Sequence, residues 1–194
     1  MNSALVNKYK SIENPPGGLV IWILILLELL TFGIALVFMV MLSKEESSIF
    51  HSSRLQLNTF IGATNTLVLL TSGYFMAQSF MFYKNAQKEK SLLNINLTIL
   101  FGFIFLLLKS IEYYLKINNG IHLDTNTFYT FYWLLTGFHF IHVATGIVIL
   151  FFLRKFSKQE MTDEKIEYFE AGTAFWHMCD LIWLLIFPII YLLF

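Results

Sequence analysis

The sequence predicts an all-α fold, a polytopic membrane bundle of five transmembrane helices with a cytoplasmic N-terminus and a periplasmic C-terminus. First, its 194 residues are 57% hydrophobic and only 13% charged, with a mean hydropathy of +0.65. Soluble domains are nearer a quarter charged, so this chain has too little charge to cover a water-soluble globule. Second, five apolar stretches are long enough to cross about 30 Å of hydrocarbon, which takes about 20 helical residues. Third, the basic residues collect on one side of these stretches.

The expected elements follow one another along the chain as a single membrane domain, residues 1–194. Residues 1–18 are polar, end in Pro15-Pro16-Gly17-Gly18, and lack the short apolar core and cleavage site of a signal peptide. We therefore expect the first apolar stretch to be retained as a span. The expected spans are 19–42, 59–82, 92–115, 127–153 and 172–194. The longest polar connection, 154–170, is expected to be a solvated loop.

The distribution of Lys and Arg predicts the orientation of the bundle. Nine basic residues lie on the side of the N-terminus and three on the opposite side, while Lys109 lies within a span. Cytoplasmic segments carry the excess of Lys and Arg, so the N-terminus is expected in the cytoplasm, or in the matrix of a mitochondrion. The nine are Lys8, Lys10, Lys84, Lys88, Lys90, Arg154, Lys155, Lys158 and Lys165; the three are Lys44, Arg54 and Lys116.

Three of the expected spans, the first, fourth and fifth, carry His, Asp or Glu residues in their apolar stretches. Glu28 is in the first span, His139 and His142 are in the fourth, and His177 and Asp180 are in the fifth. Glu28, His142 and Asp180 fall at similar depths, which predicts one polar cluster between these three helices. Such a cluster can join helices by hydrogen bonds, let Glu28 bind and release protons, or hold a metal ion. The Glu-x-x-His repeat of a four-helix di-iron site is absent.

Lys109 and Glu112 lie three residues apart near the outer end of the third span. They are expected to form an ion pair within the helix and to extend toward the outer interface, where Tyr113 and Tyr114 fit an aromatic belt. Small residues predict close contacts between helices. They are Gly62, Ala63, Thr66, Ser72, Gly73, Ala77, Gly137 and Gly146.

Motifs for redox chemistry are missing from the sequence. The one cysteine, Cys179, lies in an apolar stretch, so there is no Cys pair for a dinuclear copper centre and no Cys-x-x-Cys-His for covalent haem. His51 and His122 lie in outer connections, which leaves too few buried histidines for two haems and a copper ion. The sequence therefore indicates a non-catalytic membrane subunit, without catalytic, cofactor-binding or metal-binding residues of its own.

Several motifs, in order, resemble subunit III of the haem–copper oxidase superfamily. The resemblance covers about residues 19–194. Trp176-His177-x-x-Asp180-x-x-Trp183-Leu184 is close to the family's Trp-His-Phe-Val-Asp-Val-Val-Trp-Leu. The other motifs are Glu28-Leu-Leu-Thr-Phe-Gly33, Asn65-Thr66, Leu69-Leu-Thr-Ser-Gly73, Glu112-Tyr113-Tyr114 and Thr136-Gly-Phe-His-Phe-Ile-His-Val143. Lys109 departs from the pattern, because many relatives have an uncharged polar residue there.

The resemblance implies a subunit without a redox centre that packs against the catalytic subunit I. That partner holds the haem and copper, and an electron-entry subunit is also expected. Bound phospholipid, stability and proton uptake are the roles implied for this chain, in the bacterial inner membrane or, alternatively, the mitochondrial one. Five spans match shorter bacterial members, including relatives that accompany nitric oxide reductases, so oxygen and nitric oxide both remain as acceptors. The other alternative is a stand-alone proton or solute carrier built around Glu28.

Overall fold

The computed structural model describes residues 15–159 and 162–194; Lys8 and Lys10 lie outside this part of the chain. All regular structure in the described residues is helical, and five of the helices are long and apolar enough to cross a membrane, as predicted. The helices are α2 (Leu19–Glu45), α3 (Ser47–Leu55), α4 (Thr59–Lys84), α5 (Lys88–Asn118), α6 (Thr127–Ser157) and α7 (Asp163–Tyr191).

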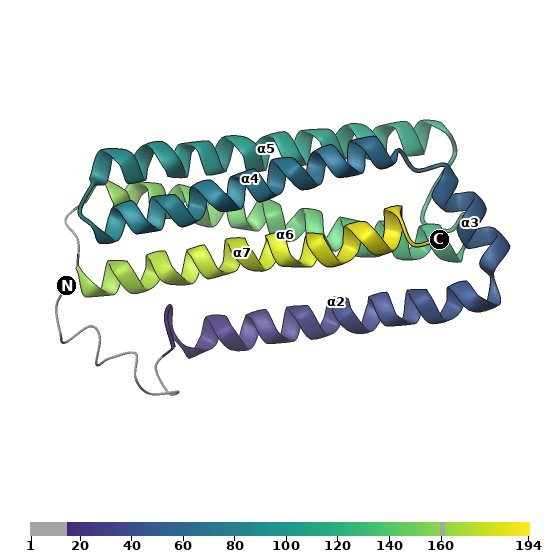
Figure 1. Ribbon diagram of the computed structural model, residues 1–194, viewed down its shortest axis with the longest axis horizontal. Coiled ribbons are helices and arrows are strands. Elements are labelled where there is room, and N and C mark those ends of the chain that lie inside the picture. The colour runs from purple at the N-terminus through teal and green to yellow at the C-terminus, as the bar shows by residue number, and fades with distance from the viewer. Residues whose placement is uncertain (1–14, 160–161) are drawn as a thin grey trace.

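The five long helices lie side by side along one axis, and α7 is at the centre of their contacts (Figure 1). It packs against α2, α4 and α6, while α5 packs against α4 and α6. The share of α7 that is buried is the largest of the five, and that of α2 is the smallest. A helix that is apolar all round and barely covered by its own chain is suited to an apolar environment, such as lipid or another membrane subunit.

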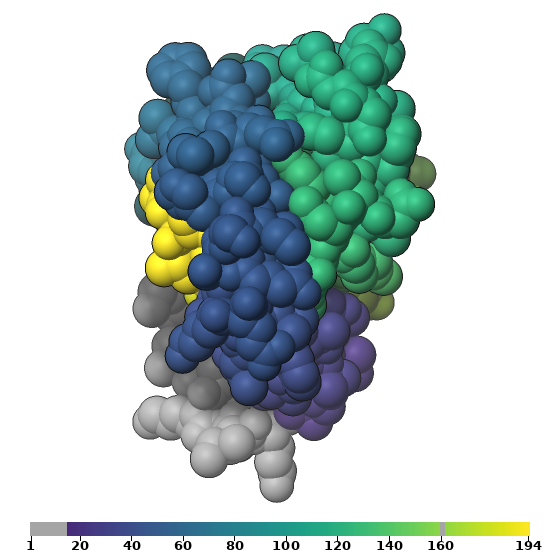
Figure 2. Space-filling view, turned by 90° about the vertical axis from the view of Figure 1, so that its right-hand side faces the viewer, coloured from purple at the N-terminus to yellow at the C-terminus, as the bar shows by residue number. Residues whose placement is uncertain are grey.

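The short helix α3 covers the end of the bundle opposite the start of α2, where Figure 2 shows it between α2 and the connection from α5 to α6. Its Phe50 is buried between the rings of Phe128 and Phe194, with centroid distances of 5.6 Å and 5.1 Å. Arg54 donates from Nε to the carbonyl of Tyr191 at 3.1 Å. A cation there satisfies a terminal carbonyl and complements the negative end of the dipole of α7.

The expected solvated loop at 154–170 is wrong, because helix occupies most of it. α6 continues to Ser157 and α7 begins at Asp163. Thr162 caps α7 by accepting a hydrogen bond from the backbone N–H of Lys165 at 3.3 Å, and Asp163 and Glu164 supply negative charge to the first turn. These are ordinary signals of a helix start, so the end of the apolar stretch did not mark the end of the helix.

Glu170 of α7 joins two other segments at the end of the bundle where α2 begins. Its carboxylate accepts from Lys84 Nζ at 2.8 Å and from the backbone N–H of Gly17 at 3.2 Å. Gly17 has φ +79°, and a Cβ there would lie 2.8 Å from the backbone nitrogen of Ala171. The glycine therefore lets the segment that leads into α2 lie against the backbone of α7.

Some of the small residues that were expected at helix contacts do make them, but Gly137 does not and Ala77 is exposed. A Cβ on Gly62 would meet Tyr191, and one on Gly146 would meet Trp176. The expected contact at Gly137 is wrong, since a Cβ there would have no neighbour within 4 Å. Gly137 faces away from the packed interior, which spacing within one helix did not reveal.

Candidate functional site

A carboxylate and an imidazole meet between α2 and α6. His142 Nε2 lies 3.3 Å from Glu28 Oε2, and His142 Nδ1 lies 2.7 Å from the carbonyl oxygen of Phe138. A carbonyl can only accept, so Nδ1 carries a proton and donates it. The other ring nitrogen, Nε2, can then accept a proton from the Glu28 carboxyl group or, when protonated, donate to the carboxylate.

This pair lies halfway along the apolar helix α6. His142 lies fifteen residues from either end of α6, about 22 Å at the helical rise. The side chains are partly exposed, 30% for Glu28 and 18% for His142. Glu28 also lines a cavity of about 380 Å³ between α2 and α6, together with Thr31, Phe131 and Phe138. The contact between Glu28 and His142 therefore lies beside a mostly apolar space outside the packed interior.

Asp180 belongs to a second pair, on the other flank of α7. His177 Nδ1 lies 3.2 Å from Asp180 Oδ2, within one helix. Oδ2 lies directly over Gly73 of α4, where a Cβ would collide with it. The structure thus divides the predicted cluster, placing Glu28 with His142 and turning Asp180 toward α4. The similar depths of these residues in their spans could not predict this separation, because depth does not tell in which direction around its helix a side chain points.

His139 is enclosed by aromatic rings and does not join His142. Its ring stacks on Trp183 at a centroid distance of 5.2 Å and meets the ring of Phe105 edge-on at 5.6 Å. Neither ring nitrogen has a hydrogen-bond partner within the described part of the chain. Among these residues, no three His, Cys, Asp or Glu side chains are grouped so that they could hold a metal ion.

Lys109 and Glu112 form the predicted ion pair, with Nζ 3.2 Å from Oε2, but they do not extend to the outer interface. Both side chains are buried, and Lys109 is only 1% exposed. Lys109 donates to Tyr191 Oη at 2.7 Å. Glu112 Oε1 accepts from Tyr132 Oη at 2.7 Å and from Tyr191 Oη at 2.6 Å. The phenol hydroxyls supply the hydrogen bonds that water would supply at the membrane interface, so the two charged groups can lie inside the bundle.

The two motif tryptophans pack at the centre of the bundle. Trp176 is fully buried and lies over Gly102 of α5 and Gly146 of α6, where glycine leaves room for its ring. Trp183 donates from Nε1 to Thr66 Oγ1 at 2.9 Å, which connects α7 to α4. Both residues hold α7 at its central position.

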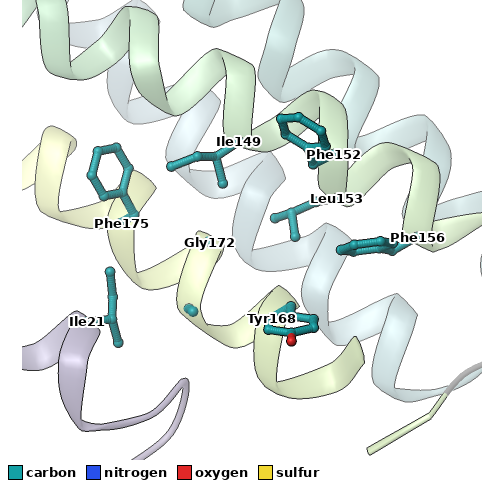
Figure 3. Close-up of a pocket in the computed structure, with 9 residues that line it drawn as sticks. Ile21, Ile149, Phe152, Leu153, Phe156, Tyr168, Gly172 and Phe175 are labelled. Carbon is teal, nitrogen blue, oxygen red and sulfur yellow. The ribbon is translucent and has the colours of Figure 1, made fainter. Parts of the chain in front are cut away.

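An apolar groove of about 360 Å³ opens between α6 and α7 near the start of α2 (Figure 3). Phe152 and Phe156 line it from α6, Tyr168 and Phe175 from α7, and Ile21 approaches from α2. The groove lies near the end of α6 that has Arg154 and Lys155 in its last turn and Lys158 directly after it. Apolar walls beside a basic rim suit an acyl chain with an anionic headgroup.

Some partners in these sites were missed by sequence reasoning. Tyr132 and Tyr191 complete the ion pair of Lys109, yet they lie 23 and 82 residues away along the chain. No periodicity within a single helix joins such positions. Gly73 was expected at a helix contact, but the carboxylate that lies over it was not.

The fold and the three polar pairs define a multi-pass helical membrane protein that holds ionisable groups within its spans. Residues 54–193 match the family described as Cytochrome c oxidase subunit III. This chain belongs to that family. The match begins inside α3, so α2 and Glu28 precede it.

Individual relatives carry the same name. The chain is 32% identical over 129 residues to cytochrome c oxidase subunit 3 of Schizophyllum commune, which covers 66% of this chain and 47% of the relative. It is also 32% identical to cytochrome c oxidase subunit 3 of Tetraodon nigroviridis, in a match that covers 70% of this chain and 51% of the relative. The subunit 3 protein of Salmo salar is 32% identical as well, in a match that covers 66% of this chain and 48% of the relative. The chain thus spans about half the length of the curated relatives it matches. These names favour the oxidase, and none supports the nitric oxide reductase alternative.

Proposed function

We propose that this chain is the non-catalytic subunit III of a haem–copper oxidase that reduces oxygen in a respiratory chain of a bacterial cytoplasmic membrane. It packs against the catalytic subunit I, which holds the haem and copper, and an electron-entry subunit completes the complex. The proposal rests on membership of the subunit III family and on five apolar spans. The proposal also agrees with the surroundings of the three histidines within the spans. His142 and His177 face carboxylates, and His139 lies among aromatic rings.

The observation that carries a proton-related role is the contact between Glu28 and His142. Because Nδ1 donates to Phe138, the other ring nitrogen is free to accept a proton from the carboxyl group or to donate one to it. Moving this proton between the two groups requires little displacement, and the adjoining cavity leaves the pair accessible from one side. Glu28 and His142 thereby support proton uptake by the catalytic subunit during sustained turnover.

Replacing Glu28 tests this role. Glu28→Gln removes the titratable group and keeps its shape, so proton uptake during sustained turnover of the complex is expected to fall, with an unchanged haem spectrum. Glu89→Gln, at an exposed position in the first turn of α5, is the matched control. Unaltered uptake in the Glu28 variant would refute the proton role, and an altered haem spectrum would place this chain at the redox centre.

Purification under mild detergent by a tag on this chain tests the wider proposal. Haem, copper and the catalytic subunit are expected to co-purify, and the preparation is expected to consume oxygen. Isolation of a haem-free homomer with transport activity would instead support the alternative of a stand-alone proton or solute carrier.

The groove of Figure 3 is the second part of the proposal, as a site for phospholipid. Its lining is apolar, and the nearby Arg154, Lys155 and Lys158 can attract an anionic headgroup. Ile149→Trp fills the groove, whereas Val148→Trp adds the same ring at an exposed neighbouring position. Native mass spectrometry is expected to show loss of bound lipid in the Ile149 variant alone. Equal lipid content in both variants would remove this site.

A further inference from the structure

The helix α2 is fastened at both ends and loosely covered between them. At its start, the Glu170 carboxylate accepts from the backbone N–H of Gly17 at 3.2 Å. At its other end α2 leads into α3, whose Phe50 is buried against the rings of Phe128 and Phe194. Between these points, α2 has the smallest buried share of the five long helices. The position of its middle part therefore depends on few contacts.

Glu28 makes the polar contact that joins this middle part to α6. Its Oε2 lies 3.3 Å from His142 Nε2. The hydroxyls of Thr31 and Ser43, by contrast, donate to carbonyl oxygens of α2 itself. Among the described residues, no other hydrogen bond or ion pair joins a side chain of α2 to another helix. The polar connection between α2 and α6 thus depends on one pair of side chains.

Open space lies on both sides of this pair along α6. On the side toward α3, the cavity of about 380 Å³ is lined by Thr31 of α2 and Leu134 of α6. On the other side, Ile21 of α2 and Ile149 of α6 line the groove of about 360 Å³ (Figure 3). Leu134 precedes His142 along α6 and Ile149 follows it, so the pair stands between the two apolar spaces.

The imidazole ring of His142 is held in its orientation. Nδ1 donates to the carbonyl oxygen of Phe138 at 2.7 Å, and the ring of Phe32 meets the imidazole edge-on at a centroid distance of 5.8 Å. Phe32 itself is only 4% exposed. Since these contacts keep Nε2 directed at Glu28, the pair separates by movement on the side of α2 rather than by rotation of the imidazole.

We propose that Glu28 and His142 form a polar latch for α2. When the pair is in contact, α2 lies against α6 and the two apolar spaces stay separate. When it parts, the middle of α2 moves away from α6 between its fastened ends, and the two spaces join along α6. One hydrogen bond between membrane helices shifts such an equilibrium about three- to tenfold, so the latch can open while α2 stays helical. The inference goes beyond the proposed function, because this movement requires neither haem nor a transferred proton.

Distances between two spin labels test the movement. A ketone-bearing phenylalanine analogue that carries a spin label replaces both Leu30, which is exposed on α2, and Leu107, which is exposed on α5. Because α5 lies on the far side of the bundle from α2 (Figure 1), the distance between the labels grows when α2 moves away. Pulsed electron paramagnetic resonance is recorded on the full chain, with the partners that co-purify with it, in lipid nanodiscs.

Two variants open the latch and two leave it closed. Glu28→Leu and His142→Phe each remove one partner, so the population at the longer distance is expected to rise about three- to tenfold. Glu28→Gln keeps a group that can donate to His142 Nε2, so its distances should match those of the unmodified chain. Thr31→Val is the matched control in the same cavity, because the Thr31 hydroxyl donates to the Leu27 carbonyl within α2. Unchanged distances in both Glu28→Leu and His142→Phe, or a longer distance in Thr31→Val, would overturn the latch.

The two proposals fail differently. If the latch is wrong, the label distances of Glu28→Leu stay unchanged, while haem still co-purifies with the tagged chain and Glu28→Gln still lowers proton uptake. If the proposed function is wrong, the unmodified chain brings down no haem, yet the longer distance still appears in Glu28→Leu.

Discussion

At the scale of the residue, the buried ion pair of Lys109 and Glu112 depends on phenols from other helices. Lys109 has an anion and the hydroxyl of Tyr191 as partners, and Glu112 accepts from two phenols. The rings of Tyr132 and Trp183 also lie within 5.4 Å of the ammonium group. Each charge is therefore compensated without water, which is the condition for keeping ions inside a membrane protein.

Removing one charge should be worse than removing both. Lys109→Met leaves the Glu112 carboxylate buried without its cation, and the expected cost is about 3–5 kcal/mol of stability. The double variant Lys109→Met/Glu112→Gln should recover much of that loss, because Gln still accepts from the phenols. Unfolding of the purified protein in detergent measures both. Additive losses in the double variant would show that the two residues do not act as a pair.

The sequence predicted the ion pair itself, because residues three apart share one face of a helix. It did not predict that the pair turns inward, since Tyr132 and Tyr191 come from other helices. The same limit applies to Asp180, whose depth was inferred from its position in the span. Its orientation toward Gly73 depends on the rotation of α7 against α4.

At the scale of the element, glycines differ in what a methyl group would meet. A Cβ on Gly102 would lie 2.8 Å from the ring of Trp176, whereas one on Gly33 would have nothing within 4 Å. Gly102→Ala is therefore expected to cost about 1–3 kcal/mol by overpacking. Gly33→Ala should be neutral or stabilise by up to about 1 kcal/mol, the helix preference for Ala over Gly. Thermal unfolding of both variants measures the difference, and equal midpoints would contradict the close packing around Trp176.

Glu170 should hold the start of α2 against the rest of the bundle. Glu170→Gln weakens the contacts to Lys84 Nζ and to the Gly17 N–H, so the first turns of α2 should open more often. A loss of about 1 kcal/mol corresponds to about fivefold faster hydrogen exchange there. Glu164→Gln, on the same helix at an exposed position, is the control. Equal exchange in both variants would show that Glu170 does not fasten this segment.

At the scale of the whole molecule, the number and order of the spans could be read from the sequence because a membrane imposes a minimum apolar length. The ends could not, since helices continue beyond the hydrocarbon into polar surroundings, as α7 does by starting at Asp163 rather than near residue 172. The short α3 was not expected either, because its sequence has no long apolar stretch. Membrane hydropathy thus identifies spans, while capping residues such as Thr162 determine where helices begin.

The orientation of the bundle is the remaining prediction, and two matched positions test it. Asn85 directly follows α4 and Asn119 directly follows α5, so both are exposed residues at helix ends on opposite sides of the membrane. The basic residues gather on the side of Asn85, so that side should be cytoplasmic. In intact cells, a membrane-impermeant thiol reagent should label Asn119→Cys and spare Asn85→Cys until the membrane is opened. The native Cys179 is fully buried and should not interfere. The reverse labelling pattern would show that the orientation of the bundle is the opposite one, with Glu170 and the apolar groove between α6 and α7 at the outer side of the membrane.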